Sequence, residues 1–95
     1  MEKVWEGMLK NRILFLGSPI DEEKVNSLIV AMMLMNAIDP EAPIELYINS
    51  AGGNILDGLA LYDAMQAIQA PIATYCVGCA LSMAACILAA NSALV

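Results

Sequence analysis

Residues 72–84, which read IATYCVGCALSMA, decide the fold. The first six of these residues are β-branched, aromatic or small apolar types, which favour a buried strand. Gly78 interrupts the run, and strong helix formers follow from Ser82 onward. We therefore predict a strand over 72–77 that turns into a helix over 82–90, with Ser82 near the junction.

The same order of strand, small-residue turn and helix occurs earlier in the chain. Residues 44–48 are typical of a second strand, the turn NSAGG follows at 49–53, and helical spacing covers 55–69. A further short apolar run at 13–16 precedes a helix that Asp21 can cap. Alternating strands and helices predict an α/β fold with right-handed crossovers and a mostly parallel sheet. Since no linker divides residues 1–95, we interpret them as one domain.

Both turns leave the carboxyl ends of predicted parallel strands, where functional loops of such sheets gather. Gly52 and Gly53 allow close backbone approach, and their N–H groups could stabilise an oxyanion. Ser82 could be a nucleophile, although the hydrolase elbow pattern would need glycine at Ala80 and Ala84. From spacing alone, a plain tight turn and a serine that caps a helix remain the simpler interpretations.

The composition limits the classes of partner. The 95 residues suffice for one small domain, and the hydrophobic fraction of 60% suggests contact with other subunits or with lipid. The net charge of −6 argues against nucleic acid as a partner. The N-terminus does not resemble a signal peptide. Residues 72–90 approach the length of a membrane span, so a tail-anchored membrane protein that uses residues 72–95 stays open as an alternative.

The cysteines predict a reducing compartment, and hence the cytoplasm. There are three of them, an odd number that suits free thiols better than a disulfide framework. Cys76 and Cys79 form a C-x-x-C pair, but the chain has no histidine and offers a poor ligand set for zinc. We expect buried structural thiols, no metal and no cofactor.

Several segments together resemble the ClpP family, the proteolytic subunits of the ATP-dependent Clp protease. They are RILFLG at 12–17, LYINSAGG at 46–53, LYDAMQ at 61–66, CVG at 76–78 and ALSM at 80–83. Their order and spacing match the family over about residues 10–91, nearly the whole chain. The combination is specific, although each segment alone is not.

This resemblance implies a crotonase-like fold of ββα units and a serine peptidase inside stacked rings of like subunits. An AAA+ ATPase unfoldase would deliver unfolded proteins as peptide substrates. By position, Ser82 matches the nucleophile, and the N–H groups of Gly53 and Met83 match the oxyanion hole. Tyr47, Tyr75 and Met33 fall near the pocket for the ATPase loops.

The chain also departs from the family. Ala51 replaces the usual proline, Ala84 replaces a glycine, and Cys79 replaces a glutamine or methionine. The family's catalytic histidine and aspartate come later than Val95. We therefore expect an N-terminal half of a ClpP-like subunit that is inactive alone, since a serine without a base is a weak nucleophile. A non-catalytic ring partner and a plain α/β interaction module are the alternatives.

Overall fold

The computed structural model of the chain describes residues 2–17 and 19–90, and strands alternate with helices as predicted. The elements are α1 (Glu2–Lys10), β1 (Ile13–Gly17), α2 (Glu22–Ile38), β2 (Ile44–Ser50), α3 (Ile55–Ala67), β3 (Ile72–Ala80) and α4 (Met83–Ala89). The sequence patterns did not predict α1. Among the other elements, β3 differs most from expectation, since it continues past Val77 to Ala80.

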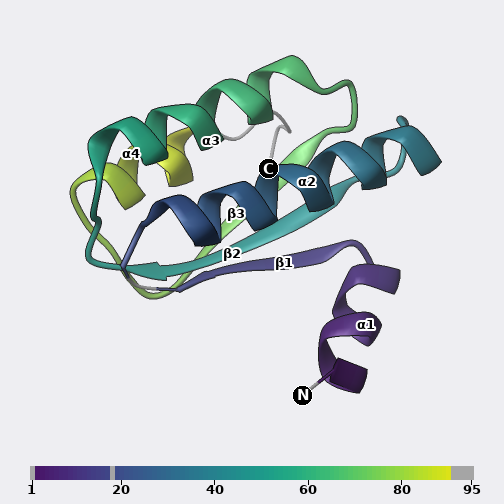
Figure 1. Cartoon of the computed structure of the whole chain (residues 1–95), viewed down its shortest axis with the longest axis horizontal. Helices are drawn as coiled ribbons and strands as arrows, with labels where there is room; N and C mark the ends of the chain where they lie inside the picture. The colour runs from purple at the N-terminus through teal and green to yellow at the C-terminus, as the bar shows by residue number, and fades with distance from the viewer. Residues whose placement is uncertain (1, 18, 91–95) are drawn as a thin grey trace.

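The strands form one parallel sheet of three strands in the order β1-β2-β3. Successive right-handed crossovers that advance in one direction put their helices on the same face of a sheet. Figure 1 shows α2, α3 and α4 over one face, while α1 lies apart from them near the start of β1. The predicted α/β class with a mostly parallel sheet is therefore confirmed.

The hydrophobic core fills the space between the sheet and these helices. Alternate strand residues such as Leu14, Leu46 and Ile72 are fully buried there. The helices contribute Val25, Leu28, Met32, Met35, Leu61, Met65, Met83, Ala84 and Ile87. The opposite face carries a row of aromatic residues, since Phe15 pairs in register with Tyr47, and Tyr47 with Tyr75. Within this chain that face is only partly covered.

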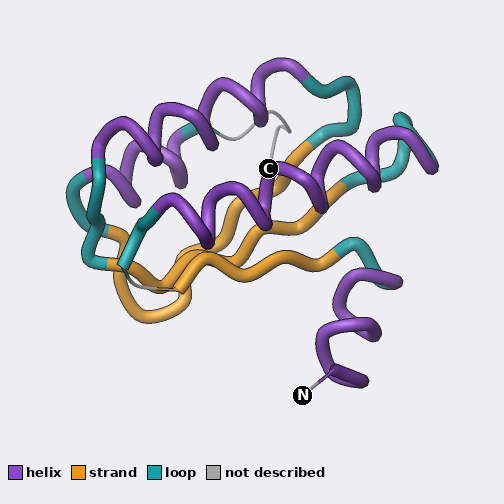
Figure 2. The backbone as a smooth tube through the Cα atoms, viewed as in Figure 1, coloured by secondary structure: helices purple, strands orange, loops and turns teal. Residues whose placement is uncertain are grey.

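Local side-chain hydrogen bonds fix where α2 and α3 begin. The Asp21 carboxylate accepts a hydrogen bond from the Lys24 N–H at 2.9 Å, as the sequence predicted for an N-cap. Asn54 does the same for α3, because its side-chain oxygen accepts from the Asp57 N–H at 3.0 Å. Both helices therefore begin at the sheet edge where β1 and β2 end, as the tube in Figure 2 shows.

Arg12 connects the segments at the other end of the sheet, where β1 and β2 begin. Its guanidinium donates hydrogen bonds to four backbone carbonyls, those of Met35 (2.8 Å), Asp39 (2.9 Å), Ala42 (2.8 Å) and Pro43 (3.1 Å). The last turn of α2 contains no basic residue of its own. Arg12 thus supplies the positive charge and the donors that a helix C-terminus favours.

Residues 72–90 do not form a single apolar helix. They divide into β3 and the seven-residue helix α4. Over residues 2–17 and 19–90, no helix is long and apolar enough to cross a membrane. Residues 91–95, the rest of the proposed tail anchor, lie outside the described residues.

The expected burial of the cysteines is wrong. Cys76 and Cys86 are exposed, and Cys79 is half-buried. β3 is an edge strand, and its residues from Cys76 onward are exposed or half-buried. The residues around the thiols are apolar in sequence, but the fold leaves the thiols exposed or half-buried.

Candidate functional site

Ser82 has an unusual backbone conformation, with φ of 54° and ψ of −126°. Positive φ costs a residue with a side chain about 1–3 kcal/mol and is often found at functional sites. Ser82 occupies the position before α4, but its side chain makes no capping hydrogen bond. Helix capping therefore does not explain this serine. The sharp turn between a strand and a helix presents an exposed serine, as nucleophile elbows do, despite the alanines at positions 80 and 84.

The glycine turn after β2 lies directly against Ser82. Gly52 has φ of 108°, and a Cβ on it would lie 3.0 Å from Ser82 Cβ and 3.4 Å from Ser82 Oγ. Any side chain at position 52 would therefore meet the serine. The two turns that the sequence predicted to share a sheet edge do come together there.

Among residues 2–17 and 19–90, the backbone N–H groups of Gly53 and Met83 take part in none of the hydrogen bonds around them. Ile20 N–H donates to Gly52 O, and Asn54 N–H donates to Ile20 O, both at 3.0 Å, which skips the Gly53 N–H. At the start of α4, the amides of Ala84 and Ala85 donate to the carbonyls of Leu81 and Ser82. The Met83 N–H takes part in neither bond, and the first amides of a helix have no acceptor within it.

The residues after Ser82 are anchored in the core. Met83 is buried, and its side chain packs against the bare α-carbon of Gly58 in α3, where a Cβ would overlap it. Ala84 is fully buried within the hydrophobic core. Its extra methyl group, relative to the glycine usual in the family pattern, therefore packs inward, while Ser82 is exposed.

A bulge in β3 leads the chain to Ser82. Ile48 pairs with Cys76 and Ser50 with Ala80, so β3 advances four residues while β2 advances two. Gly78 allows this with φ of 91°, and a Cβ on it would lie 2.7 Å from Asn49 Oδ1. The same oxygen accepts a hydrogen bond from the Cys79 N–H at 3.3 Å. Pairing then resumes beyond Gly78, which is why the strand is longer than the sequence pattern predicted.

The three residues expected near an ATPase-docking pocket fall on two surfaces. Tyr47 and Tyr75 stack on the open sheet face, with ring centroids 4.9 Å apart. Met33 is 59% exposed on α2 and lines a groove with Ala64, Ala67 and Ile68 of the helical layer. The fold thus brings Tyr47 and Tyr75 together, whereas Met33 lies on a different surface of the chain.

Tyr47 is also electrostatically perturbed. Its hydroxyl lies 3.4 Å from Glu45 Oε2, to which it donates a hydrogen bond. Desolvation, followed by the negative charge of Glu45, raises the pKa of Tyr47 above its ordinary value of 10.0. The tyrosine is therefore protonated at neutral pH, as its hydrogen bond to Glu45 requires.

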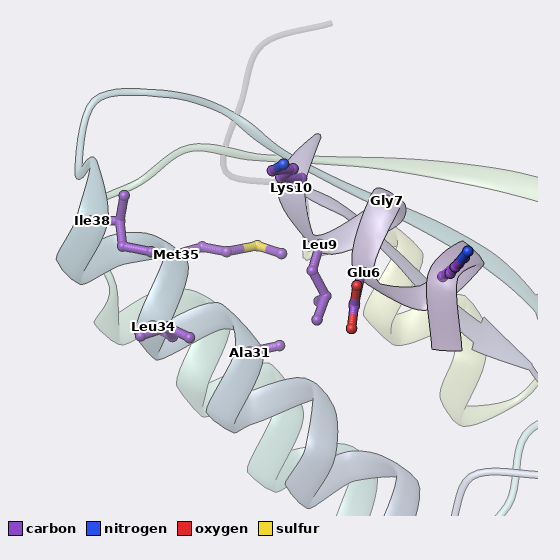
Figure 3. Close-up of a pocket in the computed structure, with 9 residues that line it drawn as sticks. Glu6, Gly7, Leu9, Lys10, Ala31, Leu34, Met35 and Ile38 are labelled. Carbon is purple, nitrogen blue, oxygen red and sulfur yellow. The ribbon is translucent and has the colours of Figure 1, made fainter. Parts of the chain in front are cut away.

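A groove of about 740 Å³ lies between α1 and α2, away from Ser82. Figure 3 shows Leu9, Ala31 and Met35 around it, with Glu6 and Lys10 on the α1 side. Sequence reasoning did not identify this groove, because it depends on the unpredicted helix α1. In the described part of the chain, no three His, Cys, Asp or Glu residues are grouped as a metal site would require.

Comparison with known proteins identifies the family. The model of the family described as Clp protease matches residues 1–94. The chain is 47% identical over 91 residues to the "ATP-dependent Clp protease proteolytic subunit 2" of Cutibacterium acnes. That match covers 96% of this chain and 43% of the relative, so the chain spans less than half of the relative's length. With this identity and a match over nearly all of its residues, the chain belongs to the Clp protease family.

Proposed function

We propose that this chain supplies the nucleophile and the oxyanion-stabilising groups of a serine peptidase site that hydrolyses peptide bonds in unfolded proteins. Ser82 is the nucleophile, and the N–H groups of Gly53 and Met83 receive the negative charge that develops on the attacked carbonyl oxygen. The strained backbone of Ser82, held against Gly52, is the observation that carries this proposal.

The base must come from another segment, because the chain contains no histidine. A serine hydroxyl needs an adjacent base to become an efficient nucleophile. We propose that residues 1–95 are one incomplete domain of the family fold, and that a histidine-bearing segment completes the site. We also propose a cytoplasmic location, which agrees with the odd number of cysteines.

We propose that the chain works in a ring of like subunits. The outer face of α2 exposes Val30, Met33, Leu34 and Ile38, and the opposite sheet face exposes Phe15. Such apolar surfaces favour contact with other subunits. Because Met33 and the Tyr47–Tyr75 stack lie on different surfaces, a pocket that contains all three residues would combine two adjacent copies. An AAA+ ATPase unfoldase would dock there.

Complementation tests the site. The chain is co-expressed with the C-terminal remainder of the Cutibacterium acnes relative, and the purified complex receives a fluorogenic peptide or a fluorophosphonate. We expect peptide hydrolysis and stoichiometric labelling of Ser82. Ser82→Ala should lower turnover by about 10³-fold or more. Ser27→Ala, at an exposed serine of α2, is the matched control and should leave turnover unchanged.

One outcome would favour the non-catalytic ring partner instead. In that case the two parts co-purify as a ring, Ser82 remains unlabelled, and Ala84→Gly does not restore turnover. The chain would then contribute only surfaces to the assembly.

A further inference from the structure

Among residues 3–4, 6–17 and 19–90, whose burial the structure describes, Ser50 is one of two buried polar residues, the other being Thr74. It ends β2 and is 0% exposed. A buried hydroxyl is unfavourable unless it is hydrogen-bonded, so its partners indicate what it does. Thr74 bonds to the Leu88 carbonyl in the core, whereas the bonds of Ser50 lie at the candidate site.

Ser50 contacts both turns of that site. Its Oγ accepts a hydrogen bond from the Gly52 N–H at 3.1 Å and lies 3.4 Å from the Gly52 carbonyl, to which it can donate. Its own carbonyl accepts a hydrogen bond from the Leu81 N–H at 3.0 Å. One residue thus bonds to the glycine turn through its side chain and to the serine turn through its backbone.

The hydrogen bond from the Gly52 N–H to Ser50 Oγ restrains Gly52 at the point where it lies against Ser82. Gly52 O is held by the Ile20 N–H at 3.0 Å, and its α-carbon lies against Ser82. The Ser50 hydroxyl accepts from the Gly52 N–H and lies 3.4 Å from Gly52 O, so it restrains the Ala51–Gly52 peptide and also the Gly52–Gly53 peptide, which carries the Gly53 N–H. A rotation of the Gly52–Gly53 peptide would shift the Gly53 N–H relative to Ser82 Oγ. A displacement of about 1 Å at a reacting site can lower the rate by 10²-fold.

We propose that Ser50 is a positioning residue, whose hydroxyl fixes the Gly52–Gly53 turn against Ser82 so that the oxyanion donor and the nucleophile keep their relative geometry. This inference rests on the proposed function. It adds a role for a side chain that would not itself touch the substrate.

The variants are Ser50→Ala and Asn36→Ala, each in the complex with the C-terminal remainder of the relative. Ser50→Ala removes the hydroxyl and little volume. Asn36→Ala is the matched control, because its side-chain oxygen accepts hydrogen bonds from the amides of Gln69 (3.1 Å) and Ala70 (2.9 Å), which precede β3 at the opposite sheet edge. Each substitution leaves backbone amides without their acceptor: the buried amide of Gly52 in one case, and the partly buried amide of Ala70 with the exposed amide of Gln69 in the other.

Two measurements separate positioning from loss of stability. The first is the reaction of Ser82 with a fluorophosphonate, resolved into a maximal rate and a half-saturating concentration. The second is hydrogen exchange resolved to single amides. We expect Ser50→Ala to lower the maximal rate by about 10- to 100-fold, with full labelling at completion. The Gly52 amide should exchange about three- to tenfold faster, in line with loss of a hydrogen bond of typical net strength.

Asn36→Ala should instead speed exchange at Gln69 and Ala70 and leave the maximal labelling rate within about twofold, since distant sites act nearly independently. A Ser50→Ala complex that keeps the wild-type rate, or that keeps wild-type exchange at Gly52, would overturn the inference. If wild-type Ser82 is not labelled, the proposed function fails, whereas wild-type labelling with an unaffected Ser50→Ala variant counts against Ser50 alone.

Discussion

The α-carbon of Gly52 faces the side chain of Ser82 so closely that a Cβ at position 52 would lie 3.0 Å from the serine Cβ and 3.2 Å from the Leu81 carbonyl oxygen. Gly52 is also buried and has φ of 108°, a conformation that side chains rarely adopt. Position 52 therefore excludes a side chain for two independent reasons, one being its own backbone conformation and the other its contact with Ser82.

Gly52→Ala should disable the site in the complemented complex. We expect the rate of Ser82 labelling to fall by about 10²-fold, because the added methyl group displaces the serine or opens the turn. Gly7→Ala is the matched control, since Gly7 is in α1 and has no neighbouring atom within 4 Å of an added Cβ. That variant should stabilise the fold slightly, because alanine is the better helix former. Equal labelling rates for both variants would contradict the close packing at Gly52.

The chain alone should show no turnover of a fluorogenic peptide and no phosphonate adduct at Ser82, because it contains no histidine to act as the base. Intact-mass measurement after incubation tests this. Iodoacetamide provides the positive control for reagent access, since Cys76 and Cys86 are exposed and should be alkylated. Stoichiometric labelling of Ser82 in the isolated chain would show that another group activates it.

Arg12→Lys should destabilise the fold even though it keeps the positive charge. A lysine cannot reproduce a planar fork that reaches four carbonyls, and hydrogen bonds to charged groups contribute about 1.5–3 kcal/mol each. We expect a loss of about 2–4 kcal/mol in the free energy of unfolding, allowing for partial replacement by water. Urea denaturation of the complemented complex measures it, with Lys3→Ala at an exposed position as the control. A midpoint equal to that of Lys3→Ala would show that the Arg12 bonds contribute nothing net.

Tyr47 should ionise above the ordinary tyrosine pKa, and Glu45→Gln should lower its pKa toward that value, because the charge of Glu45 is the largest cause after desolvation. Absorbance near 295 nm during an alkaline titration, with Tyr47→Phe to assign the signal, measures the shift. Since the folded-state pKa is raised, the stabilising contribution is fully present below pH about 10 and is lost as the pH rises through the folded-state value. An unchanged titration in Glu45→Gln would remove Glu45 as a cause.

The isolated chain should self-associate in water, and Leu34→Lys should weaken that association. Leu34 is 60% exposed on the outer face of α2, beside the similarly exposed Val30. Asp63→Ala, at an exposed position of α3, changes the net charge by the same single unit and is the matched control. Sedimentation at low micromolar concentration should show a smaller average mass for Leu34→Lys than for the wild type, whereas Asp63→Ala should match the wild type. A monodisperse 10.1 kDa wild-type species that unfolds cooperatively would contradict the expectation.

The sequence by itself determined the order of strands and helices from β1 onward and the helix cap at Asp21, because capping depends on local side-chain chemistry. Asp21 was identified because an acceptor side chain before an apolar helical pattern is sufficient to satisfy the first free amides. The parallel sheet followed from alternation and from crossover handedness, which are properties of L-amino acid chains in general. The segments around Gly52 and Ser82 also indicated the family before any contact was known.

The tertiary structure alone decided how these pieces meet. The bulge at Gly78 depends on Asn49 from the neighbouring strand, so no pattern within β3 could place Ala80 opposite Ser50. The burial of Ser50 and the exposure of Cys76 depend on which faces the helices cover, and residue type does not fix that. The strain at Ser82 is likewise not a local preference of serine. It persists because Gly52 lies against Ser82, the Leu81 N–H is bonded to the Ser50 carbonyl and Met83 is buried, and these contacts exist only once distant segments have packed.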